Sequence, residues 1–223
     1  DCIYWYGASA EQIHVIAPPL PPLFSLSKEE ADRMCKKRGI ASRFVLSIGT
    51  IEPRKHLIAM IEAFERSGLP EQGYEYIIVG TLGWKHRAIQ KRMRKSPAVR
   101  YLGYVTTEEK QALLMSAQML AFVRIYEGFG FPPLEAMQLH TPVLCSNRSS
   151  IPEVVHDAAL MVDPHNVRDI ALGMRTLSTD QSLRAELGIR AQLRVQSFPS
   201  PEQIGRSLRD VFQNAVHSFH TKV

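Results

Sequence analysis

The sequence predicts an α/β fold: a doubly wound, Rossmann-like parallel sheet that continues into C-terminal helices. Short apolar runs rich in branched residues alternate with longer amphipathic segments, which is the order of β-α-β units in a parallel sheet. The composition, 45% hydrophobic and 22% charged, is that of an average globular protein. At 223 residues, the chain is long enough to bury a sizeable core.

Six apolar runs, each three to five residues long, predict the strands. They lie at residues 44–48, 76–79, 99–102, 119–123, 143–145 and 160–162. A seventh run, residues 13–16, stands before Pro18-Pro19 and is either one more strand or part of a linker.

Amphipathic segments between and after these runs predict the helices. Those between strands lie at residues 55–67, 85–95, 107–117, 132–139 and 167–177, and two more follow at 181–196 and 201–219. We therefore expect an entry or linker segment over residues 1–40, where proline is frequent. A Rossmann-like domain would span 41–179, and a helical extension of the same domain would span 180–223.

Cysteine use and hydropathy narrow the class of protein. The three cysteines are widely spaced with no C-x-x-C pair, which favours a reducing cytosol over a disulfide or zinc framework. The longest mainly apolar stretch, residues 113–123, is shorter than the roughly 18 residues of a membrane span. The chain begins at Asp1 with no charged-then-apolar leader, as a fragment would.

A formal charge of +5 favours an anionic partner: nucleotide phosphate, nucleic acid or lipid headgroup. The densest basic stretch, residues 85–95, is read either as a solvated helix face or as a patch for a membrane surface or nucleic acid. There is no aromatic stacking array and no recognition-helix motif, so we expect no nucleic-acid partner.

Ligands of open α/β sheets bind beyond the carboxyl ends of the strands, so the loops after strands are the candidate sites. The first such loop, Gly49 to Lys55, delivers Arg54 and Lys55 at the start of a predicted helix. Cations at a helix N-terminus oppose the macrodipole, and a bound anion would offset that cost. The alternative is that both are ordinary exposed residues.

A second loop, residues 124–131, is rich in glycine and ends where a helix begins. Gly128 and Gly130 permit close approach of a ligand to the backbone. Glu127 precedes the glycines and Glu135 is expected in the first turn of the following helix, so we expect them to contact different parts of one ligand. The alternative gives Glu135 the usual role of a carboxylate near a helix N-terminus.

Three ordered motifs resemble the C-terminal, nucleotide-sugar-binding domain of glycosyltransferase family 4, retaining enzymes with the GT-B fold. They are Gly49-Thr-Ile-Glu-Pro-Arg-Lys55, Glu127-Gly-Phe-Gly-Phe-Pro-Pro-Leu-Glu-Ala-Met137 and Ser149-Ser-Ile-Pro-Glu-Val-Val-His-Asp-Ala-Ala159. The resemblance covers about residues 44–163, and the last motif is most similar to mannosyltransferases.

The resemblance implies a role for each matched residue. Arg54 and Lys55 would neutralise the donor diphosphate, Glu127 would serve the donor sugar, and Glu135 would accept hydrogen bonds from the ribose. The base would be read near Tyr104 and Val105. Backbone groups at Gly49 and at the run 128–130 (Gly128, Phe129, Gly130) would complete the donor site, and Arg54, Lys55 and Glu127 would be its catalytic residues.

The resemblance also implies the cofactors, partners and location. The donor would be a GDP- or UDP-linked sugar, with GDP-mannose favoured, and no further cofactor is expected. No metal is expected either, because fixed cations would stabilise the diphosphate and no Asp-x-Asp motif is present. The acceptor, a glycan or a lipid-linked glycan, would bind an N-terminal domain outside this chain, so we expect the fragment alone to transfer nothing. A cytoplasmic location, with peripheral contact at the inner face of the membrane, follows.

Competing interpretations remain open. The same fold serves epimerases and phosphorylases, the two glutamates resemble a glycosidase pair, and the chain could be a non-catalytic nucleotide-binding module. Two positions depart from the family pattern. His56 stands where Asn is common and is expected on the helix surface, and His140 replaces a Gly that commonly precedes Thr-Pro. We expect His140 at a helix C-terminus with a tolerated positive φ.

Overall fold

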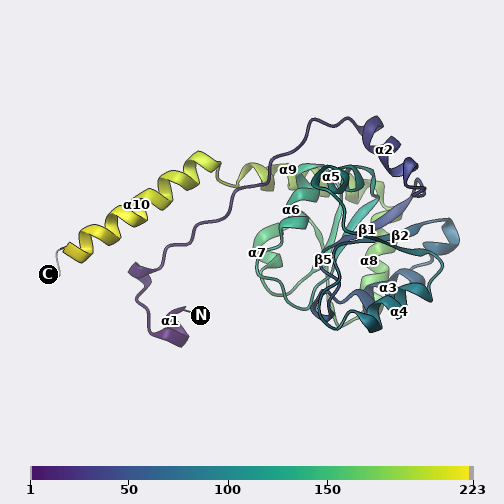
Figure 1. Cartoon of the computed structure of the whole chain (residues 1–223), viewed down its shortest axis with the longest axis horizontal. Coiled ribbons are helices and arrows are strands. Elements are labelled where there is room, and N and C mark those ends of the chain that lie inside the picture. Colours follow the sequence, from purple (N-terminus) through teal and green to yellow (C-terminus); the bar gives the residue numbers. More distant parts are fainter. Residues whose placement is uncertain (1, 221–223) are drawn as a thin grey trace. The chain divides into compact units, whose positions relative to one another are not determined.

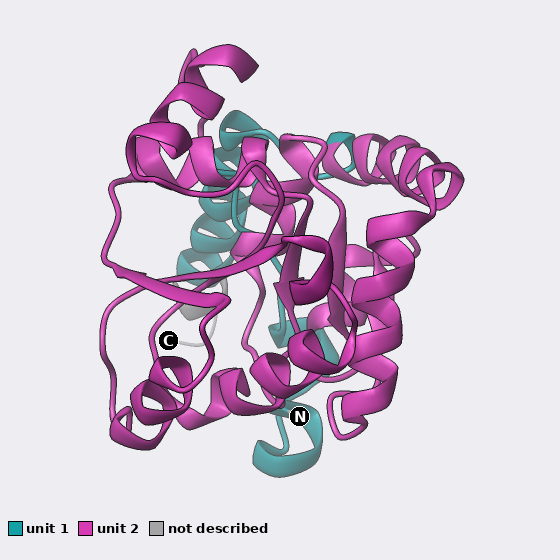
Figure 2. Cartoon of the chain, turned by 90° about the vertical axis from the view of Figure 1, so that its right-hand side faces the viewer, with its two compact units in different colours: residues 1–21, 196–223 teal, residues 22–195 magenta. Residues whose placement is uncertain are grey.

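The structure is a computed structural model that describes residues 2–220, with side chains described up to residue 217. It divides into two compact units (Figure 2): a smaller one within residues 1–21 and 196–223, and a larger one, Pro22–Val195. These limits differ from the boundaries at 40 and 180 that we expect from composition. The domain boundaries that we expect from the sequence therefore stay a prediction.

The larger unit contains a six-stranded parallel sheet (Figure 1). Its strands are β1 (Phe44–Ile48), β2 (Glu75–Val79), β3 (Val99–Gly103), β4 (Met119–Phe122), β5 (Val143–Ser146) and β6 (Leu160–Val162). Their order is β3-β2-β1-β4-β5-β6, and every neighbouring pair is parallel. This is the doubly wound order, so the predicted fold class is confirmed, and each predicted strand is correct to within one residue at either end.

The predicted helices are confirmed to within two residues at either end. In the larger unit they are α3 (Leu57–Arg66), α4 (Arg87–Arg94), α5 (Thr107–Ser116), α6 (Phe131–Gln138), α8 (Val167–Thr179) and α9 (Gln181–Gln196). The prediction missed α2 (Lys28–Lys37) and α7 (Ile151–Val155). A capping box between Ser27 and Glu30 starts α2, and its buried Ala31 and Cys35 lie on the helix that packs against α5. The expected linker therefore holds a packed helix.

Helices cover the sheet on both faces. α3 packs against α4 and α8, whereas α5 packs against α2 and α6, and Figure 1 shows the strands between these two groups. The main core cluster joins the strands to the first group, with Phe64, Tyr76 and Met174 fully buried. The central strands are buried on both sides, which explains why their sequences are mainly apolar, whereas the edge strands β3 and β6 are largely half-buried.

The smaller unit is mostly helical and extended chain. It holds α1 (Cys2–Tyr6), a 3₁₀ turn (Ala10–Gln12) and α10 (Pro201–His220), and residues 13–16 form no strand, which resolves that alternative in favour of a linker. The predicted end of the last helix near Phe219 falls where side chains lie outside the described residues. Within residues 2–220, no helix is both long enough and apolar enough to cross a membrane.

The basic stretch forms α4 and the turn before it. Ile89 and Met93 are buried while Lys85, Arg87, Lys91 and Arg94 are exposed, so the interpretation as an amphipathic helix is confirmed. No residue between Glu75 and Glu108 is acidic, although Arg92 pairs with Glu65 of the neighbouring α3. Contact of this face with an anionic membrane surface stays a prediction.

Candidate functional site

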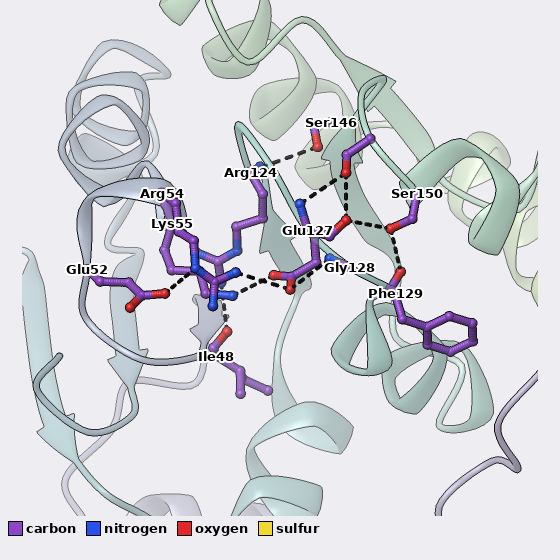
Figure 3. A network of polar contacts seen from close by, with 11 residues as sticks. Ile48, Glu52, Arg54, Lys55, Arg124, Glu127, Gly128, Phe129, Ser146 and Ser150 are labelled. Atoms are coloured by element: carbon purple, nitrogen blue, oxygen red, sulfur yellow. Dashed lines mark hydrogen bonds and ion pairs between the residues drawn. The ribbon is translucent and has the colours of Figure 1, made fainter. Parts of the chain in front are cut away.

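The two candidate loops meet where the strand order reverses. β1 and β4 are adjacent strands, and the chain leaves β1 towards α3 and β4 towards α6, which belong to opposite helical layers. Loops that diverge in this way open a crevice at the carboxyl ends of the strands, the usual ligand position in such sheets. Figure 3 shows Arg54 and Lys55 from the first loop facing Glu127 from the second.

A close approach of backbones shapes the first loop. The loop after β1 binds the loop after β2, since Ile51 N donates to Thr81 O at 2.8 Å. A Cβ on Gly80 would lie 2.0 Å from Gly49 O, so only glycine fits there. The chain then forms a 3₁₀ turn, Pro53–Lys55, and His56 enters the left-handed region at φ 56° before α3 begins. Arg54 and Lys55 therefore lie on the 3₁₀ turn that precedes α3, and not at the start of the helix itself as predicted.

An ion cluster joins the loops. Lys55 Nζ lies 2.5 Å from Glu127 Oε2, and Arg54 Nη1 lies 3.4 Å from Glu127 Oε1. Arg54 Nε also pairs with Glu52. The Lys55 side chain is 9% exposed whereas that of Arg54 is 43% exposed. The buried lysine and the half-exposed arginine thus share one carboxylate, and the alternative of two ordinary surface cations is wrong for Lys55.

Burial and charge set the protonation of the pair. Burial lowers the pKa of Lys55, the bond to Glu127 offsets part of this effect, and the charge of Arg124 adds to the lowering. Burial alone would raise the pKa of Glu127, but the bond to Lys55 and the nearby cations keep that pKa below its ordinary value. Glu127 is therefore ionised at neutral pH and acts as the counterion of the cluster.

Arg124 is a site residue that we did not predict. It directly follows β4, its side chain is 1% exposed, and its guanidinium carbon lies 4.4 Å from the centre of the Phe122 ring. Its Nη1 donates to Lys55 O at 2.6 Å and its Nη2 to Ile48 O at 2.7 Å. The available signal was a charged residue directly after an apolar run, because ligands of open α/β sheets bind beyond the carboxyl ends of the strands.

Two serines of the third motif support the glutamate loop. Ser149 Oγ and Ser150 Oγ donate to Glu127 O at 2.6 and 2.8 Å, and Ser150 Oγ also reaches Phe129 O at 3.1 Å. Gly130, at φ 112°, begins α6, and a Cβ there would lie 2.8 Å from Ile151 Cδ1. The motif resembling mannosyltransferases therefore fixes the backbone of Glu127 and its neighbours. The sequence identified this motif but did not predict that its serines would bind the backbone of the Glu127 loop.

Glu135 lies deeper than predicted. It falls on the second turn of α6, is buried, and its Oε1 accepts from Lys110 Nζ of α5 at 2.6 Å. Its Oε2 is buried without a hydrogen-bond partner among the described residues. The interpretation as a first-turn carboxylate that stabilises the helix N-terminus is therefore wrong. The free oxygen leaves Glu135 able to accept one more donor.

Replacing Lys110 with Met tests this pair. We expect Lys110→Met to lower the free energy of unfolding by about 2 kcal/mol, less than the roughly 3–5 kcal/mol of a fully buried pair, because the Lys110 side chain is 24% exposed. Chemical denaturation measures this loss. Adding Glu135→Gln should restore part of the stability, and a double variant as unstable as Lys110→Met would show that the loss comes from packing.

Of the remaining predicted residues, Gly128 contacts the ion cluster, whereas Tyr104 and Val105 do not join it. Tyr104 and Val105 follow β3, and Tyr104 is 73% exposed. Neither forms a hydrogen bond or ion pair with Arg54, Lys55 or Glu127 in the described part of the chain. Gly128 N lies 3.4 Å from Glu127 Oε1. Among residues 2–220, no group of three or more His, Cys, Asp or Glu side chains could hold a metal ion.

The two histidine departures have different outcomes. His140 follows α6 at φ 57° and donates its backbone N–H to Met137 O at 3.2 Å, which confirms the expected helix C-terminus. His56 is not a helix-surface residue, because it precedes α3 and is half-buried. Its Nε2 lies 2.8 Å from Pro164 O. This bond satisfies one ring nitrogen of the half-buried side chain.

Comparisons with known sequences cover most of the larger unit. The family described as glycosyl transferases group 1 matches residues 31–194. O-antigen chain mannosyltransferase B of Escherichia coli is 35% identical over 159 residues, which is 70% of this chain and 42% of that protein. The MMP alpha-(1->4)-mannosyltransferase of Mycolicibacterium hassiacum is 26% identical over 223 residues, covering 97% of this chain and 52% of the relative.

A comparison with solved structures supports the same fold. A glycosyltransferase from Rickettsia africae superposes with a TM-score of 0.84 at 16% sequence identity, covering 96% of this chain and 60% of that chain. At this identity the likeness concerns the fold alone. The chain spans about half of the length of the curated relatives named above.

Proposed function

Since this chain belongs to the glycosyl transferases group 1 family, we propose that it is the donor-binding part of a retaining hexosyltransferase that uses a nucleotide sugar. The observation that carries the proposal is the cluster of Arg54, Lys55 and Glu127 at the switch point of the sheet. A diphosphate needs fixed cations in a shielded position, and this cluster provides one buried and one half-exposed cation there.

Transfer would be assisted by charge stabilisation. Negative charge grows on the diphosphate as the bond to the sugar breaks, and Arg54 and Lys55 would stabilise that charge more strongly in the transition state than in the ground state. Glu52 and Glu127 already neutralise the cations, so the phosphates must compete with these carboxylates. Glu127 would then be released towards the donor sugar.

The other predicted contacts extend the donor site. We assign the phosphate and sugar hydroxyls to the backbone of Gly49, Gly128, Phe129 and Gly130, and the base to Tyr104 and Val105. The free oxygen of Glu135 would accept from the ribose. The two curated relatives are mannosyltransferases, which supports GDP-mannose as the donor, with UDP-linked sugars as the competing class.

Acceptor choice would lie outside this chain, in line with its partial coverage of its relatives. We propose a glycan or lipid-linked acceptor, a cytoplasmic site of action and no cofactor. An epimerase, a phosphorylase and a non-catalytic nucleotide-binding module are the alternatives. Formation of a labelled glycan product by the whole protein would distinguish a transferase from an epimerase or a phosphorylase. Nucleotide binding without any turnover would favour the non-catalytic binding module.

Thermal-shift measurements against GDP, UDP and ADP and their sugars, with and without divalent ions, test the donor site. We expect stabilisation by one nucleoside diphosphate in the presence of a chelator. A ligand at a hundred times its Kd stabilises the folded state by about 2.7 kcal/mol, which is a clear shift. No stabilisation by any of these ligands would contradict the proposal.

Replacing Arg54 with Ala should weaken binding of that nucleotide about tenfold. A charge-assisted hydrogen bond contributes about 1.5–3 kcal/mol, and the lower end applies because Arg54 is 43% exposed and must leave Glu52 and Glu127. Calorimetric titration measures the change. Arg66→Ala is the matched control, since Arg66 pairs with Glu62 on α3, and an unchanged affinity in Arg54→Ala would remove Arg54 from the site.

A further inference from the structure

A buried guanidinium lies directly beneath the proposed phosphate site. Arg124 is the largest fully buried side chain of the described residues. Burial lowers its pKa to about 10, which leaves it charged at neutral pH. Its two hydrogen bonds go to the neutral carbonyls of Ile48 and Lys55, and its Nε is buried with no partner among the described residues.

An unpaired buried cation is unfavourable unless something nearby compensates it. No salt bridge joins Arg124 to an acid in the described part of the chain, although the charges of Glu127 and Glu52 partly stabilise it. The three cations Arg54, Lys55 and Arg124 outnumber these two carboxylates, so the cluster suits an anion that arrives from outside.

The hydrogen bonds of Arg124 also hold the cationic turn in place. Nη1 binds Lys55 O, and the neighbouring backbone N–H of Ile125 lies 3.4 Å from Arg54 O. Both carbonyls of the Arg54-Lys55 dipeptide are thus bound from the loop after β4. Figure 3 shows the Arg124 side chain reaching across from its own loop to this turn.

Gly49 packs directly against the buried guanidinium. A Cβ at Gly49 would lie 3.3 Å from Arg124 Nη2 and 3.9 Å from Lys55 Cε. The two cations therefore lie side by side against the same bare backbone position. A side chain there would press on Nη2, whereas glycine lets the loop after β1 pack against the buried guanidinium.

We propose that Arg124 is the third cation of the phosphate site, a positioning residue that holds the Arg54-Lys55 turn and adds a buried charge compensated by the diphosphate. The proposal rests on the proposed function for its ligand. The hydrogen bonds of Arg124 to this turn and its effect on the pKa of Lys55 do not need a ligand, so they can be measured independently of nucleotide binding.

The first measurement is calorimetric titration of wild type, Arg124→Met and Arg124→Lys with the nucleoside diphosphate that binds wild type best among GDP, UDP and ADP. We expect Arg124→Met to weaken binding about ten- to a hundredfold, because it removes both a buried positive charge near the phosphates and the hydrogen bond that holds the Arg54-Lys55 turn. Arg124→Lys keeps the charge but cannot bind both carbonyls, so an intermediate affinity is expected. If Arg124→Met does not fold, Arg124→Gln replaces it as the uncharged variant.

The second measurement needs no ligand. Amine labelling of Lys55 as a function of pH, followed by mass spectrometry, reports the pKa of Lys55, and we expect that pKa to rise in Arg124→Met because a nearby positive charge is lost. Arg190→Met, which removes a surface arginine from α9, should change neither the affinity nor this pKa.

The outcomes separate the two proposals. Wild-type affinity in Arg124→Met, or an unchanged Lys55 pKa, overturns the role of Arg124. A lower affinity that Arg124→Lys does not partly restore also overturns the charge role. If wild type binds none of the three nucleotides, the proposed function fails, and the Lys55 pKa alone decides the claim on Arg124.

Discussion

Lys55→Met is expected to abolish nucleotide binding in the working concentration range and to destabilise the protein by about 3 kcal/mol. The lysine ammonium lies 2.5 Å from Glu127 Oε2 with only 9% of its side chain exposed. Losing one partner of a buried pair costs about 3–5 kcal/mol, and the lower end applies because Arg54 stays within 3.4 Å of Glu127. Chemical denaturation and calorimetric titration measure the two effects.

The stability loss should depend on pH in a definite direction. Lys55 helps keep the pKa of Glu127 below its ordinary value, so this pair stabilises the fold above the unfolded-state pKa of the glutamate. That contribution disappears as the pH falls through the folded-state pKa. The difference in stability between wild type and Lys55→Met should therefore be largest near neutral pH and shrink on the acid side.

A second substitution distinguishes the electrostatic cost from the lost function. Lys55→Met combined with Glu127→Gln removes the unpaired carboxylate, so we expect its stability to exceed that of Lys55→Met. Nucleotide binding should stay absent, because the phosphate cation is still missing. Nucleotide affinity close to wild type in Lys55→Met would contradict the assignment of Lys55.

Gly80→Ala is expected to reduce the free energy of unfolding by about 4 kcal/mol. The new Cβ would meet Gly49 O at 2.0 Å and Gly49 C at 2.6 Å, and Gly80 has φ 143°. Strain at such a φ and overpacking each cost about 1–3 kcal/mol. The clash is with backbone, so no side-chain movement relieves it, and the loop that carries Arg54 and Lys55 must shift.

Gly188→Ala is the matched control for this substitution. Gly188 lies within α9, and a Cβ there meets nothing within 4 Å. Alanine favours helix over glycine by about 0.8–1 kcal/mol, so this variant should be as stable as wild type or slightly more stable. Thermal unfolding compares the two variants, and equal stability of Gly80→Ala and wild type would show that the two loops are not packed as described.

Local patterns in the sequence predicted all six strands and most of the helices. The central strands β1, β2, β4 and β5 are almost entirely buried, so they form mainly apolar runs that are recognised without knowing which strands are neighbours. α2 was missed because its apolar positions are sparse. Ala31 and Cys35 are its only buried residues, and a capping box was its main signal.

The sequence by itself determined the parallel α/β fold, the three motifs and the choice of Arg54 and Lys55 as candidate cations, since these depend on short-range periodicity and on ordered residue types. Only the tertiary structure decided how they meet. The reversal of strand order brings the loops after β1 and β4 together, although 72 positions separate Lys55 from Glu127. It also buries Arg124 between them. Such contacts depend on which strands are neighbours, and no local pattern encodes that pairing.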